Sequence, residues 1–338
     1  RASPLHQPNA PKGTAMGNLS LQSLMRRPEA GAFLGMVFVA IFFTIFGGIL
    51  FLSPQGVASW LNVAANLGII AVPVGFLMIS GELDISIGAM VPAASMTVAI
   101  VSGYYGLPMI VGIVVTLGFG LLVGLINGII VVRTNVPSLI VTMGTLFAIA
   151  GLVLFLSIIL TNSTSVSMPN IEPWAKALFG SFIGGTYQVL VVWWLLFTAA
   201  FFYFLHISPW GNWVYALGGD KSSARNAGIP TDRLTIGLFV LSSVSAAFVG
   251  MCQTLLFNSA QVSAGQSYIF NTIISVVVGG VLLTGGFGSV VGIFFGTITF
   301  AIVNQGIYFT DFDRNLSSLI IGVMLLVAVL MNNTFRKM

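Results

Sequence analysis

The sequence predicts an all-α integral membrane protein. Eight uncharged apolar runs of about 20 residues and two shorter ones fill most of the 338 residues. Of all residues, 57% are apolar and only 6% are charged, and the mean hydropathy is +1.03. A soluble domain carries about 25% charged residues, and an uncharged apolar run of about 18 or more indicates a membrane helix. The strands of a membrane barrel would instead alternate over about 10 residues.

We expect about ten transmembrane helices, because each backbone amide in lipid needs an internal partner. The two short runs, at 88–102 and 270–284, are flanked by glycine and predict broken or partly re-entrant helices. The ten predicted spans lie at 32–52, 57–79, 88–102, 108–132, 138–160, 187–206, 235–255, 270–284, 288–308 and 315–333.

Residues 1–31 differ from the rest of the chain. Their basic residues Arg1, Lys12, Arg26 and Arg27 stand among Pro, Ser, Asn and Gly, with no apolar signal-peptide core. We interpret residues 1–31 as a flexible basic N-terminal tail, with a transit peptide as the alternative, and residues 32–338 as one transmembrane domain.

The basic residues predict which loops face the cytoplasm. With the N-terminal segment inside, ten of the 12 Lys and Arg residues fall on the inner side, and only Lys176 and Arg314 fall outside. Positively charged inner loops are the rule in membrane proteins. An odd number of spans would move Arg336 and Lys337 outside, so we predict that both termini are cytoplasmic. The net charge of +4 is spread over short loops, which favours a topological role over nucleic-acid binding.

Two segments suggest an internal repeat. Residues 120–130 contain Gly120 and Asn127, and residues 296–307 contain Gly296 and Asn304 in a similar apolar setting. The predicted spans that hold them cross the membrane in opposite directions. An inverted repeat of five plus five helices is therefore a hypothesis, although apolar sequences match easily by chance.

Acidic residues near membrane depth occur only at Glu82 and Asp84, in the segment Gly-Glu-Leu-Asp-Ile-Ser-Ile-Gly at 81–88. One interpretation is a helix break on a transport pathway, with Ser86, Asn127 and Asn304 as further pathway residues. The other, which we favour, is a cytoplasmic turn in which Asp84 caps the following helix. A proton relay needs further intramembrane acids or histidines, and the chain has none to continue it.

Neutral amides recur in or near the predicted helices. Most are expected to bond between helices, and a path lined by amides suits an uncharged, hydroxyl-rich solute. They are Asn62, Asn66, Asn127, Gln253, Asn258, Asn304 and Gln305.

The largest inner loop, at about 207–234, contains a candidate docking segment. Asp220 can cap a short helix through Ala227, with Gly228 as its C-terminal stop. A short polar helix on a cytoplasmic loop could dock a partner. The alternative is an ordinary solvated loop, which composition alone favours.

A glycine-rich segment at 279–292 predicts close packing of helices. A phosphate loop is the rival interpretation, but the pattern G-x-x-x-x-G-K-[ST] occurs nowhere in the chain. We also find no catalytic triad and no metal-ligand cluster, and His206 is expected to be structural. The candidate packing glycines are Gly279, Gly280, Gly285, Gly286 and Gly288.

Several motifs in order resemble one family. Residues 81–88 match G-G-[IL]-D-[IL]-S-[VI]-G, except that glutamate replaces the second glycine. Residues 124–128 match G-x-x-N-G, and residues 137–144 match P-x-x-I-x-T-x-G. Residues 216–229 match A-x-G-G-[ND]-x-x-A-A-R-x-x-G-I, with one Ala replaced by Ser, and residues 279–292 match G-G-x-x-L-x-G-G-x-G-S-x-x-G. From about residue 35 onward, the chain resembles the permease subunit of ATP-binding-cassette importers for monosaccharides, of the ribose, xylose and arabinose type.

This resemblance implies a pore of two permease subunits, identical or siblings, in the bacterial inner membrane. It also implies two cytoplasmic ATPase subunits, which hold ATP and Mg²⁺, and an extracytoplasmic sugar-binding protein. This chain would then be no enzyme and hold no cofactor itself. The ATPase-coupling loop would comprise Gly218, Gly219, Asp220, Ala224, Arg225, Gly228 and Ile229.

The resemblance is incomplete at one place, and other functions stay open. Ile269 stands where the family often has Glu, which leaves the outer gate and the solute undetermined. The main rival function is a secondary transporter coupled to protons or sodium. An importer permease of the same class for nucleosides or branched amino acids is a closer alternative, and a membrane enzyme or structural protein is a third.

Overall fold

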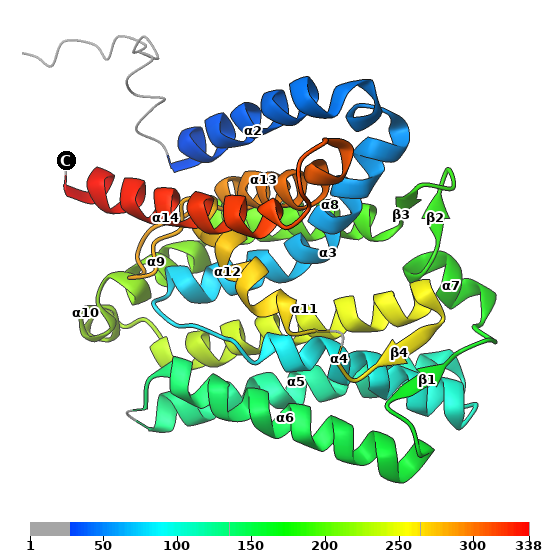
Figure 1. The fold of residues 1–338 in the computed structure, drawn as a ribbon. Coiled ribbons are helices and arrows are strands. Elements are labelled where there is room, and N and C mark those ends of the chain that lie inside the picture. The colour runs from blue at the N-terminus through cyan, green and yellow to red at the C-terminus, as the bar shows by residue number, and fades with distance from the viewer. Residues whose placement is uncertain (1–27, 135, 264, 338) are drawn as a thin grey trace, which may run out of the picture.

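The structure is a computed structural model that describes residues 28–134, 136–263 and 265–337. It is a bundle of helices with two small pairs of strands (Figure 1). The α-helices are α2 (Pro28–Phe51), α3 (Pro54–Ile79), α4 (Ile87–Val98), α5 (Met109–Arg133), α6 (Ser138–Thr161), α7 (Pro173–Phe179), α8 (Leu190–Phe202), α9 (Pro209–Gly219), α10 (Lys221–Asn226), α11 (Thr231–Phe257), α12 (Ser267–Val278), α13 (Val290–Gly306) and α14 (Leu316–Lys337).

Shorter elements extend three helices and pair two loops. A π-helix, η1 (Ala99–Tyr104), continues α4, another, η2 (Tyr203–Ile207), continues α8, and the 3₁₀ turn η3 (Ile307–Phe309) ends α13. Antiparallel pairs form between β1 (Ser165–Ser167) and β4 (Ser259–Gln261), and between β2 (Phe182–Ile183) and β3 (Tyr187–Gln188).

The prediction of an all-α, multi-pass membrane protein is confirmed. Among the described residues, eight helices are long and apolar enough to cross a membrane, and two shorter apolar helices, 267–278 and 316–328, complete the predicted set of ten. Pro28 begins α2, as suits a residue without a backbone N–H in a first helical turn. Of the predicted tail, residues 28–31 therefore belong to α2, and residues 1–27 lie outside the described residues.

Three predicted boundaries were wrong. The span expected at 270–284 ends at Val278, because Gly280 adopts a left-handed φ of 88° and turns the chain. The span expected at 187–206 begins with β3, and its helix starts only at Leu190. The inner loop expected at 207–234 contains α9 as well as the short helix α10.

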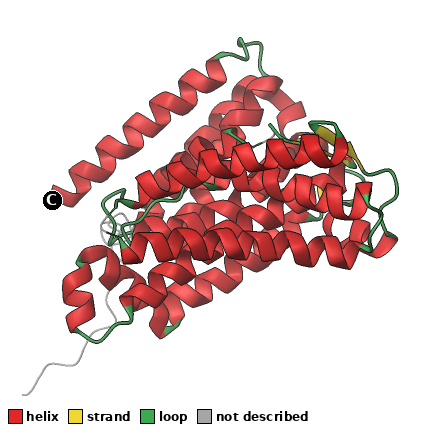
Figure 2. Cartoon of the chain, turned by 90° about the horizontal axis from the view of Figure 1, so that it is seen from below, coloured by secondary structure: helices red, strands yellow, loops and turns green. Residues whose placement is uncertain are grey.

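The most buried spans form the centre of the bundle. In the most apolar stretch of α3, 89% of the residues are buried, against 11% in α2. The outer helices α2, α5, α6 and α8 expose large apolar side chains such as Phe38, Ile49 and Phe147. Figure 2 shows α14 at the edge of the bundle, where it packs on α12 and α13. Such uniformly apolar outer faces suit contact with lipid.

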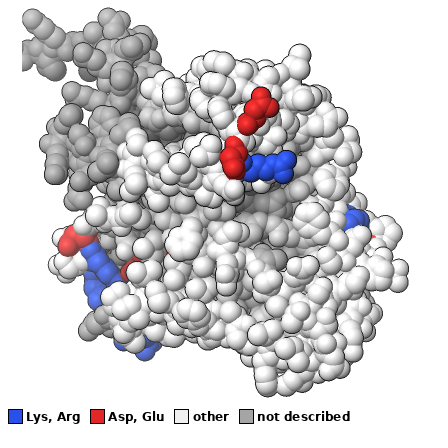
Figure 3. Space-filling model, in the orientation of Figure 1, with Lys and Arg blue, Asp and Glu red and all other residues white. Residues whose placement is uncertain are grey.

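The charged loops lie at opposite ends of the bundle. Figure 1 shows α9, α10, the start of α2 and the C-terminal end of α14 at one end, and α7 with both strand pairs at the other. On the face drawn in Figure 3, charged side chains occur in a few small groups with uncharged surface between them. The predicted topology likewise places both ends of the membrane domain and the α9–α10 loop on one side, and α7 on the other, as in Figure 1.

Helix contacts at the centre are reciprocal. The fourth predicted span, α5, packs on α11, which is the seventh. The ninth, α13, packs in turn on α3, which is the second. An inverted repeat of five plus five helices would exchange these pairs, so the hypothesis of a repeat has the packing it needs.

Glycines allow α5 and α11 to approach closely. A Cβ built on Gly124 would lie 2.5 Å from the Cα of Val240, and one on Gly128 would lie 2.7 Å from the Cα of Ile236. Gly120 stands one turn earlier, against Ala247. Three glycines at a spacing of four residues therefore form one continuous contact along the helix.

We predict that Gly124→Ala destabilises the protein by about 1–3 kcal/mol, because the added methyl group overlaps the backbone of α11. Gly118→Ala is the matched control, since nothing among the described residues lies within 4 Å of its added Cβ. The control should be neutral or gain about 0.5–1 kcal/mol from helix propensity. Thermal unfolding in detergent measures both variants, and equal melting temperatures would contradict the close contact.

Candidate functional site

The short helix α10 has the caps that the sequence predicts. The Asp220 carboxylate oxygen Oδ1 accepts hydrogen bonds from the Ser223 amide at 2.6 Å and from the Ser222 hydroxyl at 2.7 Å. At the other end, Gly228 adopts a φ of 85°, and the Ile229 amide donates to the Ala224 carbonyl at 3.1 Å. This left-handed closure is a common way to end a helix. The helix ends at Asn226, one residue before the predicted Ala227.

Arg225 ties α10 to the beginning of α11 and stays exposed. Its Nη2 lies 2.5 Å from Oδ1 of Asp232, and its Nε donates to the Thr231 hydroxyl at 3.3 Å. The side chains of Arg225 and Asp232 are 59% and 50% exposed. A hollow of about 300 Å³ lies beside them and is lined by Arg225, Ile229, Pro230, Thr231, Asp232 and Arg233. The ion pair thus shapes the loop and leaves its surface open to a partner.

Backbone contacts join the end of α9 to two turns of the bundle. A Cβ on Gly218 would overlap the carbonyl oxygen of Ile79 and would lie 2.5 Å from the amide nitrogen of Gly286. The same Gly286 amide donates to the Ile79 carbonyl at 2.7 Å. A Cβ on Gly285 would lie 2.9 Å from the Cα of Gly81. We call this meeting of the turn at 79–86, the end of α9 and the loop at 279–289 the glycine junction.

Side chains also cross the glycine junction. Lys221 Nζ lies 3.8 Å from Oε1 of Glu82. The Tyr215 hydroxyl donates to the Gly288 carbonyl at 2.7 Å. His206 Nε2 accepts from the Val290 amide at 3.3 Å, which confirms a structural role for this histidine. Sequence analysis did not identify Tyr215, because no motif distinguishes this residue from the other aromatic residues of the inner loop.

Asp84 lies in a buried network of hydrogen bonds. Its Oδ1 accepts from the Ser86 amide at 2.9 Å and from the Ser86 hydroxyl at 2.5 Å, and its Oδ2 accepts from the Ser242 hydroxyl of α11 at 2.8 Å. The Asn127 side-chain amide of α5 donates to the Ser86 hydroxyl at 2.9 Å. The network brings together three of the five predicted pathway residues and holds the start of α4 against α5 and α11.

The surroundings of Asp84 favour a structural role. The residue is 1% exposed, and burial raises the pKa of its carboxyl group above the ordinary value, although the hydrogen bonds from Ser86 and Ser242 oppose that rise. Both carboxylate oxygens have donors. The bond from the Ser86 amide to Asp84 forms a turn two residues long before α4, whose N-cap residue is Ser86 rather than Asp84.

The other two predicted pathway residues lie apart from this network. Glu82 pairs with Lys221 at the glycine junction. Asn304, on α13, accepts a hydrogen bond from its neighbour Gln305 at 2.9 Å. The five residues therefore do not form one site.

The glycines at 279–288 divide into two groups. Gly279 lies at a close helix contact, since its Cβ would be 2.6 Å from the carbonyl oxygen of Gly292 on α13. The remaining four do not pack between helices as predicted. They lie in the loop at 279–289 and have positive φ values, and they are Gly280, Gly285, Gly286 and Gly288.

Amides meet at the opposite end of the bundle. Asn66 of α3 donates to the Gln188 side chain at 2.6 Å and accepts from Gln253 of α11 at 3.3 Å. Gln253 also donates to the Tyr268 hydroxyl of α12. The Asn62 side chain accepts a hydrogen bond from the backbone amide of Gln188 at 2.9 Å. Of the amides predicted from sequence, Asn66 and Gln253 thus bond between helices at this end, whereas Asn62 bonds to β3.

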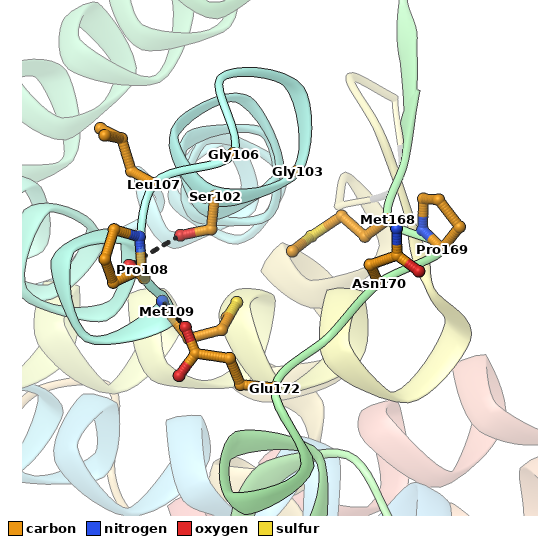
Figure 4. A pocket seen from close by; sticks show the side chains of 10 residues that line it. All are labelled: Ser102, Gly103, Gly106, Leu107, Pro108, Met109, Met168, Pro169, Asn170 and Glu172. Atoms are coloured by element: carbon orange, nitrogen blue, oxygen red, sulfur yellow. Dashed lines mark hydrogen bonds between the residues drawn. The ribbon is translucent and has the colours of Figure 1, made fainter.

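A second hollow, of about 370 Å³, lies at that same end (Figure 4). Glu172 borders it and accepts hydrogen bonds from the Met109 amide at 2.8 Å and from Trp174 Nε1 at 2.5 Å. These bonds hold the pKa of the Glu172 carboxyl group below its ordinary value. The residues that line this hollow are Ser102, Gly103, Gly106, Leu107, Pro108, Met109, Met168, Pro169, Asn170 and Glu172.

The two hollows, as far as their lining is described, contain no cluster of metal-binding side chains. Within the described ranges, no group of three His, Cys, Asp or Glu side chains is placed to hold a metal ion. Cys252 is free and buried. The fold is that of a multi-pass membrane protein, and one of its charged ends carries the short, capped helix α10.

Comparison with known proteins identifies the class. Residues 56–329 match the family described as the permease component of branched-chain amino acid transport systems. The chain belongs to this family, which confirms the resemblance to importer permeases and makes the chain a transport subunit. No solved structure matches it.

Curated relatives are permeases too. The chain is 29% identical to the fructose import permease protein FrcC of Rhizobium meliloti, over 92% of this chain and 86% of the relative. It is 31% identical to the xylose/arabinose import permease protein XylH of Sulfolobus acidocaldarius, over 91% and 87%. It is 28% identical to the autoinducer 2 import system permease protein LsrD of Photorhabdus luminescens, over 78% of each chain.

We predict that Asp84→Leu destabilises the protein by about 1–3 kcal/mol, because it leaves buried hydroxyl donors of Ser86 and Ser242 without an acceptor. Asp84→Asn keeps one acceptor oxygen and should lose less. Thermal unfolding in detergent ranks the three proteins. A leucine variant as stable as the wild type would remove the structural role of Asp84.

The cap of α10 has a predicted pH dependence. Hydrogen bonds from Ser222 and Ser223 lower the pKa of Asp220 from 3.8 to about 2. A lowered pKa in the folded state means that the cap contributes fully above about pH 4. Its contribution is lost as the pH falls toward 2. Hydrogen exchange of the α10 amides, corrected for intrinsic rates, measures this loss.

Two variants separate the hydrogen bond from the charge in this cap. Asp220→Ala should speed exchange in α10 at every pH above 4, whereas Asp220→Asn keeps a capping oxygen. The asparagine variant should therefore stay protected and lose the pH dependence. Unchanged exchange in the alanine variant would contradict the capping role.

Proposed function

We propose that this chain is the membrane-spanning permease subunit of an ATP-driven importer in the bacterial inner (plasma) membrane, and that it translocates a monosaccharide. The observation that carries the proposal is the family match over residues 56–329 together with relatives named as fructose and xylose/arabinose import permeases. An extracytoplasmic binding protein would deliver the sugar to the end that carries α7 and the strand pairs.

The energy for transport would come from separate subunits. The chain contains no phosphate-loop pattern, so ATP and Mg²⁺ are assigned to two cytoplasmic ATPase subunits. Each ATPase would receive the segment around α10, which presents the exposed Arg225 and the hollow beside it. A second permease subunit, identical or a sibling, would complete the pore.

The charge distribution disfavours an ion-coupled transporter. Such a protein normally uses carboxylates that take up and release an ion within the membrane. Of the two acids near membrane depth, Asp84 has donors on both oxygens and Glu82 faces Lys221. Both of these acids, among the residues that the structure describes, are therefore already engaged by protein groups.

Neutral amides within the bundle and the names of the relatives support a sugar as the solute. Amides such as Asn66 and Gln253 donate and accept hydrogen bonds without charge, as hydroxyl-rich solutes require. Branched amino acids and nucleosides are the alternatives within the same class of importer. Binding of labelled fructose, xylose, arabinose, leucine and uridine to the co-purified binding protein distinguishes them, and a preference for leucine or uridine would overturn the sugar assignment.

Reconstitution of the complete transporter in liposomes tests the energy source. Uptake should require ATP on the ATPase side and should persist without ion gradients. Uptake that continues without ATP when a proton or sodium gradient is present would replace the proposal with ion-coupled transport.

We predict that Arg225→Ala and Gly228→Trp separate ATP hydrolysis from transport. The first loses the ion pair that shapes the docking loop, and the second forces a bulky side chain into a φ of 85°. Solute uptake should fall at least tenfold while ATP hydrolysis continues. Arg133→Ala, at the end of α5 away from this loop, is the control for loss of an exposed charge. Normal uptake in both variants would contradict the docking role.

A further inference from the structure

Two short apolar helices have ends at one place in the structure. The turn at 79–86 leads into α4, and the loop at 279–289 follows α12 and leads into α13. The two turns touch, because a Cβ on Gly285 would lie 2.9 Å from the Cα of Gly81. The start of α4 and the end of α12 are therefore connected through turns that touch, although 180 or more residues separate them in sequence.

The end of α9 packs directly against the place where the two turns touch. Gly218 faces the carbonyl of Ile79 and the amide of Gly286, which are hydrogen-bonded to each other at 2.7 Å, and the close approach leaves no room for a side chain. Backbone groups in direct contact have no flexible side chains to absorb a displacement, and packed interiors compress little. A shift of Gly218 must therefore move both turns.

Two side chains of the same segment hold one turn each. Lys221 faces Glu82 of the first turn at 3.8 Å, and the Tyr215 hydroxyl donates to Gly288 of the second at 2.7 Å. Glu82 is only 17% exposed, so it lies at the contact rather than on the open surface. Residues 215–221 are thus attached to both the turn at 79–86 and the loop at 279–289.

We propose that the glycine junction is the point where motion of α9 and α10 is passed to α4 and α12 together, with Glu82, Lys221 and Tyr215 as positioning residues. The proposal rests on the proposed function, in that the ATPase supplies the motion. The Asp84 network extends the path, because it holds the start of α4 to α5 and α11. One displacement then reorients helices from both halves of the chain.

Charge reversal tests the ion pair in the complete, reconstituted transporter. Glu82→Lys and Lys221→Glu each place like charges together, and the double variant restores opposite charges. Each single variant should consume severalfold more ATP per solute molecule transported, and the double variant should return toward the wild-type ratio. Arg133→Glu reverses an exposed cation that makes neither of the ion pairs seen in the described residues, and its ratio should not change. A double variant no better than the worse single one would overturn the proposal.

Tyr215→Phe removes a single hydroxyl and tests the second attachment. It should lower solute transported per ATP, while the amount of ATPase that co-purifies stays unchanged. If the ratio also stays at the wild-type value, Tyr215 has no positioning role. Lost co-purification in Lys221→Glu would assign that lysine to docking, and Glu82→Lys, on the other side of the pair, then decides whether the junction transmits.

A measurement on the permease alone keeps this inference separate from the proposed function. Hydrogen exchange of Glu82→Lys should increase in both the turn at 79–86 and the loop at 279–289, and not in the β1–β4 pair at the opposite end. An increase confined to one turn would overturn the mechanical link, whatever the energy source. Failure of the wild-type transporter to use ATP, with both turns responding, would instead overturn the proposed function and leave the link standing.

Discussion

The structure depends on close approach of backbones at glycine. Lipid chains are as apolar as leucine side chains, so burial from water does not drive membrane helices together. Contact area must come from short interhelical distances instead. Gly124 provides this between α5 and α11, Gly292 provides it between α12 and α13, and Gly218 provides it between α9 and the two turns. The same close approach at glycine therefore builds both the central bundle and the contact between α9 and the two turns.

The sequence predicted those features that are local and missed those that depend on partners. Span lengths follow from apolar runs, and the caps of α10 follow from Asp220 and Gly228, because both signals lie within a few residues. The glycines at 280–288 were predicted to pack between helices. The sequence does not reveal that their φ values are positive and that they form a loop instead. Their true partners, Ile79 and Gly218, lie 60 or more residues away.

Glu82 and Asp84 show how the surroundings decide the role of a carboxylate. They are two residues apart and formed one candidate site in the sequence. Asp84 turns inward, where hydroxyl groups from its own turn and from α11 satisfy it. Glu82 turns toward the beginning of α10 and lies 3.8 Å from Lys221. Only the position of Ser242 and Lys221 separates the two outcomes, and no local pattern reports that position.

The placement of polar groups also determines where energy can enter. At the end with β2 and β3, the side chains of Asn66, Gln188, Gln253 and Tyr268 are neutral and are bonded to one another. At the other end, α10 is capped, charged and partly exposed, and its neighbour Gly218 touches two turns without slack. The proposed transmission therefore needs no long lever, because backbone contacts run directly from the end of α9 to both turns.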